Sequence, residues 1–167
     1  MLIKFAVKNF RGFAEKIEWD LSHPSNYSFN TYAVKDGVIK NGIIYGPNGS
    51  GKTNFSVALF DIVNHLTQKS KKPDYYQNFV YGGDSNLNVD FEYTFKFDDQ
   101  TIEYKYSKNV FGALVKEALI VDATVIFKRR IGALELNEQQ FPINKDAKRN
   151  LQINANSISI VNYLLTS

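Results

Sequence analysis

Cysteine is absent from this 167-residue chain, and no uninterrupted apolar run approaches the length of a membrane span. Without cysteine the chain forms neither a disulfide framework nor a thiolate metal site, and a reducing compartment is its natural setting. The first residues, MLIKFAVKNF, carry two lysines and lack the small-residue cleavage pattern of a signal peptide. Since a bilayer-spanning helix needs about 20 apolar residues, we expect a cytoplasmic protein without a membrane partner.

The chain also has little net charge. Its 20 lysines and arginines and its 17 acidic residues leave a net charge of +3 and are interspersed along the sequence. The overall charge therefore does not indicate nucleic-acid binding. The densest basic cluster, Gln68–Lys72, precedes Pro73 and is typical of a solvated loop.

Apolar and aromatic residues are plentiful, at 44% and 14% of the chain. A chain of this length and composition can bury a core and fold as one domain. We expect a single unit, 1–167, in three parts. Residues 1–72 hold a strand pair and a glycine-rich loop between a strand and a helix, residues 73–149 form an antiparallel β meander, and residues 150–167 start a helical segment.

Alternation of apolar and polar residues with a period of two predicts the strands. It marks a pair at 3–7 and 13–21, joined at 9–12, and a hairpin over 89–106 that turns at 98–100. Further apolar runs extend an antiparallel meander, at 113–121, 124–128 and 133–136.

Different patterns flank the glycine-rich loop. Val38–Tyr45 is almost wholly apolar, which predicts a short strand buried on both faces. After the loop, apolar residues recur at steps of three and four and predict a helix with one buried stripe, formed by Phe55, Leu59, Ile62 and Leu66. The looser spacing at 150–165 predicts an amphipathic helix that has no cap signal before Ser167.

The loop itself matches the pattern G-x-x-x-x-G-K-[ST] in full, with Gly46, Pro47, Asn48, Gly49, Ser50, Gly51, Lys52 and Thr53. Its glycines let the backbone curl so that successive N–H groups converge on a phosphate. We expect Lys52 to reach the β- and γ-phosphates as the catalytic cation and the Thr53 hydroxyl to ligate Mg²⁺. The positive end of the following helix adds to the same place. An apolar strand before the loop and a striped helix after it favour a phosphate site over an incidental glycine turn, so we predict a nucleoside triphosphate and Mg²⁺ as ligands, with ATP and GTP both open at this point.

The surroundings of this loop carry a family resemblance. The opening strand pair with Asn9–Phe13 (NFRGF), and GPNGSGKTN with Asn54 after the threonine, resemble the ABC-type ATPases of the RecF, SMC and OLD-nuclease kind. The chain is most similar to stand-alone bacterial AAA-family ATPases with an ABC-like core, many of which belong to phage-defence and toxin–antitoxin systems. The aromatic hairpin after the loop helix looks like that group as well. The resemblance covers nearly the whole chain, although only the P-loop is a specific motif.

This resemblance implies an α/β fold with α+β character, namely a P-loop NTPase with an ABC-ATPase-like N-terminal lobe and an antiparallel β subdomain. It places Asn54 at the nucleotide and Arg11 at the bound phosphates or ribose, with a surface arginine in a hairpin turn as the alternative for Arg11. A glutamine that helps to hold Mg²⁺ and water should follow the loop. Gln68 and Gln77 fit only by residue type, so that role stays unassigned. A homodimer and a nuclease or toxin partner are also implied.

Other motifs of the family are missing after Thr53. The sequence has no LSGGQ-like signature and no apolar strand that ends in Asp-Glu, the Walker B pair. Leu119–Asp122 comes nearest, but Ala123 stands in place of the glutamate and the flanks fit the meander. His23 in a loop and His65 late in the helix are expected to have surface or helix-end roles. We therefore expect the truncated N-terminal lobe of a longer ATPase, which binds Mg-ATP but hydrolyses it poorly.

Three kinds of function fit these observations. The first is the nucleotide-binding lobe of an ABC- or SMC-like ATPase, with turnover only in the full-length protein and a role in phage defence. The second is a nucleotide-sensing interaction module that controls a nuclease or toxin partner. The third is a DNA-repair ATPase of the RecF or SMC kind. A transporter ATPase fits least, because such a strand-rich tract rarely separates its P-loop from its signature motif.

Overall fold

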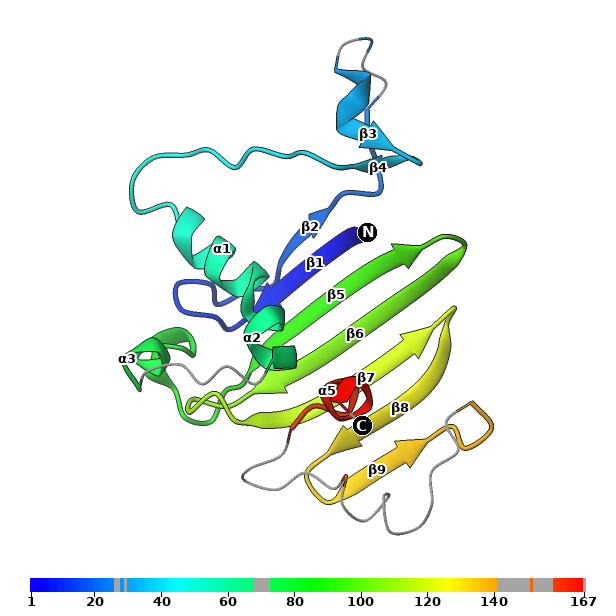
Figure 1. The fold of residues 1–167 in the computed structure, drawn as a ribbon. Helices are drawn as coiled ribbons and strands as arrows, with labels where there is room; N and C mark the ends of the chain where they lie inside the picture. The colour runs from blue at the N-terminus through cyan, green and yellow to red at the C-terminus, as the bar shows by residue number, and fades with distance from the viewer. Residues whose placement is uncertain (26–27, 29, 68–72, 141–150, 152–157, 167) are drawn as a thin grey trace.

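The computed structural model describes residues 1–25, 28, 30–67, 73–140, 151 and 158–166 (Figure 1). The fold is mixed α/β with strands in the majority, and its largest element is an antiparallel sheet in the order β2-β1-β5-β6-β7-β8-β9. The strands of this sheet are β1 Leu2–Lys8, β2 Ile17–Asp20, β5 Val89–Phe97, β6 Gln100–Lys108, β7 Leu114–Val121, β8 Thr124–Arg130 and β9 Ala133–Leu136.

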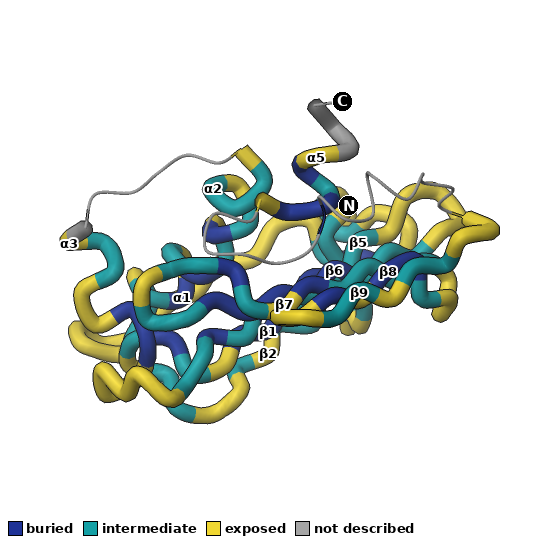
Figure 2. Tube along the Cα trace, turned by 90° about the horizontal axis from the view of Figure 1, so that it is seen from below, coloured by how far each residue is buried: buried dark blue, intermediate teal, exposed yellow. Residues whose placement is uncertain are grey.

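Short helices lie against one face of this sheet. In both Figure 1 and the edge-on view of Figure 2, α2 and α5 lie over the same side of it. The described helices are α1 Lys52–Leu59, α2 Asp61–Thr67, α3 Pro73–Tyr76 and α5 Ile160–Thr166, with 3₁₀ turns at Thr31–Ala33 and Tyr81–Gly83. None of the described helices is long and apolar enough to cross a bilayer.

The core lies between the helices and this face of the sheet. Phe5, Phe91, Tyr93 and Tyr106 project from three neighbouring strands, and each is at most 2% exposed. The register places Phe91 opposite Tyr106, and their rings stack with centroids 5.0 Å apart. Because successive side chains of a strand point to opposite faces, the alternation in the sequence separates this aromatic layer from a charged face on the other side.

The predictions of the strand pair, the hairpin and the meander are confirmed. The opening pair forms β1 and β2, which pair antiparallel, although β2 begins at Ile17 rather than at Phe13. Phe13 instead closes a tight turn, in which its N–H donates to the Phe10 carbonyl at 2.8 Å. The hairpin over 89–106 forms β5 and β6, and the meander continues through β7, β8 and β9.

The prediction of a buried strand over Val38–Tyr45 is wrong. Only Val38–Ile39 forms a strand, β4, and it pairs with β3 (Val34–Lys35) in a separate small hairpin. Residues 40–46 belong to no strand, and the side chains of Ile43 and Tyr45 are 88% and 91% exposed. An apolar run becomes a buried strand only beside strands that take its backbone hydrogen bonds and cover both faces. The described part of the chain supplies no such neighbours.

The single helix predicted after the glycine-rich loop is divided in the structure. α1 ends at Leu59, Phe60 leaves helical geometry, and α2 begins at Asp61. Asp61 is only 1% exposed and accepts hydrogen bonds from Lys108 and Tyr106 on β6. The break thus coincides with a charged residue that is directed at the sheet from the first turn of α2.

Part of the sequence-based outline lies outside the described residues. This holds for the lysine-rich cluster 68–72 and for residues 150 and 152–157 of the predicted C-terminal helix. Of the described remainder, residues 160–165 are helical as part of α5, whereas residue 151 lies in a turn and residues 158 and 159 are not helical. The division of the chain into three parts stays a prediction.

Candidate functional site

The glycine-rich loop is positioned by the packing of α1 on the sheet. Phe55, in the second turn of α1, is 8% exposed and its ring meets Phe5 of β1 edge-on, with centroids 5.5 Å apart. The ring of Trp19 from β2 approaches Phe55 at the same distance. Ala58, one turn later, is fully buried. These contacts hold α1 over the β1–β2 pair and thereby position the glycine-rich loop, which leads into the N-terminus of α1.

Glycine is required at three positions of the loop. Gly49 and Gly51 have φ of 81° and 91°, which a residue with a side chain rarely adopts. A Cβ on Gly51 would lie 2.8 Å from the Phe13 ring, and one on Gly46 would lie 2.9 Å from Ser50 Oγ. A side chain at Gly51 would thus combine an unfavourable torsion with a clash against Phe13, and one at Gly46 would displace Ser50.

Lys52 folds back over this loop. Its Nζ donates to the carbonyl oxygens of Gly46 and Pro47, both at 2.8 Å. Thr53 follows it in the first turn of α1 and is exposed to solvent. The first N–H groups of a helix have no partner within the helix and carry its positive dipole end. The structure thus brings together an ammonium group, a hydroxyl and helix N-terminal amides, which is a set of groups that fits an anionic, Mg²⁺-bound ligand.

An open hollow of about 430 Å³ adjoins the loop. Its walls come from the loop, from the exposed segment before it and from β2, and they include Phe13, Trp19, Tyr45, Glu18 and Lys52. Small-molecule sites are commonly clefts of about 300–1,000 Å³, lined mainly by apolar and aromatic groups with a few polar ones. The hollow is therefore large and apolar enough to receive the rest of a nucleotide whose phosphates occupy the loop.

Arg11 lies behind the loop and packs against α1. Its Nη1 is 3.5 Å from Asn54 Oδ1, its Nη2 is 3.5 Å from the Tyr75 carbonyl, and its guanidinium lies over the rings of Phe10 and Tyr75. Arg11 also has a left-handed backbone, with φ of 50°. It is therefore neither a free surface arginine nor directed into the hollow beside Lys52. Gln77 lines a polar pocket of about 400 Å³ together with Arg11 and Asn54, whereas Gln68 lies outside the described residues.

The nearest sequence match to a Walker B strand lies in the meander. Leu119–Val121 belongs to β7, and Asp122 forms the tight turn to β8 with φ of 46°. The Asp122 carboxylate accepts the N–H of Thr101 at 2.8 Å, so it links the turn after β7 to the start of β6. The structure describes no cluster of three or more His, Cys, Asp or Glu side chains that could hold a metal ion, within the residues that it covers.

The two histidines have different surroundings. His23 is largely exposed and lies 3.5 Å from the Asp20 carboxylate. His65 stacks on Tyr106 with ring centroids 4.0 Å apart, and its Nε2 is 2.7 Å from the Tyr104 hydroxyl. Burial, together with the nearby charges of Lys108 and Arg129, lowers the pKa of His65 well below its usual value. His65 thus lies in the last turn of α2, as expected for a helix-end residue, but it is partly buried with its ring on Tyr106 rather than on the surface.

A buried polar network under α2 and α5 was not anticipated from the sequence. Lys108 Nζ lies 2.6 Å from Asp61, and Arg129 Nε lies 2.8 Å from Glu117, with all four side chains at most 7% exposed. Glu117 also accepts from Tyr104 at 2.6 Å. A signal was present, because Lys108, Glu117 and Arg129 occupy positions in their strands that the alternation assigns to the core face.

Comparisons with protein-family models and with curated proteins found no match to this chain. What the loop can bind has to be argued from its own residues and geometry.

Proposed function

We propose that this chain binds Mg-ATP through residues 46–54 as the nucleotide-binding lobe of an ABC- or SMC-like ATPase. The observation that carries the proposal is the position of Lys52, whose ammonium is held over the loop by two backbone carbonyls at 2.8 Å. A phosphate in the loop exchanges these neutral acceptors for charged oxygens, and charge-assisted hydrogen bonds are about twice as strong as neutral ones. The glycines whose Cβ atoms would crowd the loop support the same assignment.

The residues of the loop divide the work of binding. The backbone from Gly46 to Gly51 presents N–H groups to the phosphates, and Lys52 supplies the positive charge. Thr53 is placed to ligate Mg²⁺, which would neutralise the phosphate charge when bound. Asn54 is held from behind by Arg11, so we assign Arg11 a positioning role rather than direct contact with phosphate.

The proposal includes the finer fold, a P-loop NTPase lobe of the ABC type. The glycine-rich loop that leads directly into the N-terminus of α1 supports it. In this proposal, another lobe carries the carboxylates that orient water. Efficient hydrolysis then depends on that lobe, because phosphoryl transfer needs Mg²⁺ and a positioned water in addition to the phosphate-binding loop. A homodimer, a nuclease or toxin partner and a role in phage defence rest on the resemblance alone.

Nucleotide titration tests the proposal. Isothermal titration of the chain with ATP in excess Mg²⁺ should give saturable binding, and Lys52→Ala should weaken it about 10- to 100-fold, because it removes hydrogen bonds from a charged donor. Lys40→Ala is the matched control, since Lys40 is an exposed lysine shortly before the loop. Equal affinity in wild type and Lys52→Ala, or an equal loss in the control, would contradict the proposal.

A further inference from the structure

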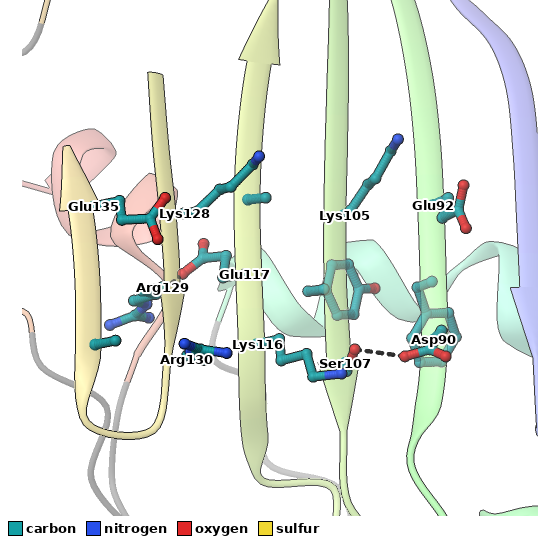
Figure 3. Close-up of a pocket in the computed structure, with 14 residues that line it drawn as sticks. Asp90, Glu92, Lys105, Ser107, Lys116, Glu117, Lys128, Arg129, Arg130 and Glu135 are labelled. Carbon is teal, nitrogen blue, oxygen red and sulfur yellow. Dashed lines mark hydrogen bonds and ion pairs between the residues drawn. The ribbon is translucent and has the colours of Figure 1, made fainter. Parts of the chain in front are cut away.

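The face of the sheet opposite the helices forms an open, charged surface far from the core. A hollow on it is lined by residues of β5 to β9, among them the charged side chains that alternate with the core positions. Figure 3 shows Lys105, Lys116, Lys128 and Arg130 projecting from neighbouring strands of this region. The two halves of this face, β2-β1-β5-β6 and β7-β8-β9, differ in whether their charged side chains are paired with one another.

In the half formed by β2, β1, β5 and β6, the carboxylates are engaged by partners from the same chain. Lysines bind three of them at 2.8–2.9 Å, and serine hydroxyls bind the other two, Asp90 and Asp20, at 2.6 Å. These contacts are Lys4–Glu18, Lys16–Glu92, Lys105–Glu103, Ser107–Asp90 and Ser22–Asp20. Charge on this half is therefore balanced locally.

The half formed by β7, β8 and β9 is different. Lys116, Lys128 and Arg130 are all exposed, and none forms an ion pair within 4.0 Å with the described residues. Lys116 and Arg130 stand directly opposite each other in the register. Like charges in that position destabilise a sheet. Among the described strand residues on this half of the face, the one carboxylate is Glu135, opposite Lys128, so the three cations exceed the negative charge of these strands.

An exposed aromatic residue lies at the same end of the sheet. The turn from β6 to β7 presents Phe111 with 79% of its surface exposed. The Asn109 carboxamide holds the turn by accepting the N–H groups of Phe111 and Ala113, both at 3.0 Å. The Asn109 backbone bonds Ala113 and Gly112 as well. The backbone of Phe111 is therefore fixed while its ring faces solvent.

We propose that the basic strip, defined as Lys116, Lys128 and Arg130, binds single-stranded nucleic acid, with Phe111 as a stacking platform for a base. Two residues along a strand span about 6.8 Å, twice the roughly 3.4 Å rise per phosphate of a stacked nucleic-acid strand. Lys128 and Arg130 can thus meet phosphates of one backbone, and Lys116 lies beside them. Cationic grooves with exposed aromatic side chains are the recurring device for binding single strands.

The aromatic residue decides between this ligand and other polyanions. A base in a single strand has a free face that can stack on Phe111, whereas the bases of a duplex already stack on one another. An acidic protein segment would neutralise the basic strip, but its carboxylates would not stack on the Phe111 ring. This inference is independent of nucleotide binding at the P-loop.

Fluorescence anisotropy with labelled oligonucleotides tests the inference on the full chain. Oligothymidine and oligouridine of equal length serve as probes, with a duplex of mixed sequence for comparison. Three phosphate contacts predict that binding weakens about 18-fold when salt rises from about 50 to about 200 mM, since the logarithmic slope for single strands is about −0.7 per contact. Replacing Lys116, Lys128 and Arg130 by alanine should lower the slope by about 2 and the affinity at least about tenfold.

Matched variants make the result specific. Alanine at Lys35, Lys40 and Lys96 removes the same charge from exposed positions elsewhere and should leave binding unchanged. Phe111→Ala should weaken single-strand binding at least about fivefold without changing the salt slope. Far-UV circular dichroism confirms that each variant is folded.

Three results would overturn the inference: absence of binding to both single-stranded probes, an equal loss in the lysine control, or duplex binding as tight as single-strand binding with no effect of Phe111→Ala. Displacement of the probe by polyglutamate at equal charge concentration would instead assign the strip to an acidic protein partner and refute the nucleic-acid ligand. The difference in affinity between oligothymidine and oligouridine shows whether DNA or RNA is the better ligand.

Discussion

Removing the cation from the buried pair beneath α2 should destabilise this protein strongly. Lys108 Nζ lies 2.6 Å from Asp61 Oδ2, and the two side chains are 7% and 1% exposed. Lys108→Met keeps the apolar stem of the side chain and removes its charge. The Asp61 carboxylate is then buried without its counter-charge, although the Tyr106 hydroxyl still donates to it at 2.9 Å.

The size of the effect follows from the burial of both partners. Breaking a buried ion pair by removing one partner costs about 3–5 kcal/mol, whereas replacing both by apolar residues of similar size is often neutral. A domain is stable by only about 5–15 kcal/mol. Lys108→Met should therefore lose a large share of the free energy of unfolding, and the double variant Asp61→Leu/Lys108→Met should recover most of it.

Urea denaturation followed by far-UV circular dichroism measures these differences if all variants share one m-value. Lys105→Met is the matched control, because Lys105 lies on the same strand and its side chain is 41% exposed in its pair with Glu103. Such a surface pair is worth about 0–1 kcal/mol. The reasoning is refuted if Lys108→Met costs no more than this control, or if the double variant loses the sum of both single effects.

Two further predictions concern Gly51 in the glycine-rich loop and His65 in α2. Gly51→Ala should weaken ATP binding and lower stability by about 1–2 kcal/mol or more, because it forces a side chain into φ of 91° and against Phe13. The control is Gly37→Ala, a glycine with φ of 75° and no atom near its Cβ position, which should leave nucleotide binding unchanged in the same titration. The pKa of His65 is depressed in the folded state, so the unfolded chain takes up a proton on His65 at a higher pH than the folded chain does. The stabilisation from neutral His65 is therefore complete above about pH 6.5 and is lost as the pH falls below that value. Urea denaturation at about pH 7.5 and about pH 5.5 should show wild type losing more stability than His65→Gln, and an equal loss in both would contradict a depressed pKa of His65 in the folded state.

Local patterns in the sequence predicted most of the sheet. Alternation over 89–106 was sufficient because a hairpin pairs neighbouring segments, and each segment carries its own division into core and solvent faces. The same alternation also contained the misplaced charges Lys108, Glu117 and Arg129. Their pairing could not be predicted, since Lys108 binds a carboxylate on α2, 47 residues away in the chain.

The segment before the P-loop shows the limit of such patterns. An apolar run such as Val38–Tyr45 can form a stable strand only if other segments pack on both of its faces, and the run itself does not determine whether such segments are present. Residues 42–45 are exposed because no described strand lies beside them. The position of Arg11 was equally undecided, since its contacts with Asn54 and Tyr75 depend on how α1 and α3 pack.

By itself, the sequence determined the features that depend on torsions and on neighbours in the chain: the glycine curl of 46–51, the placement of Lys52 and Thr53 at the start of a helix, and the aromatic hairpin. Only the tertiary structure decided which charges are buried in pairs and which are left exposed on β7 and β8. The physical reason is that backbone torsions and side-chain alternation act over a few residues, whereas burial and charge pairing depend on segments that meet only after folding.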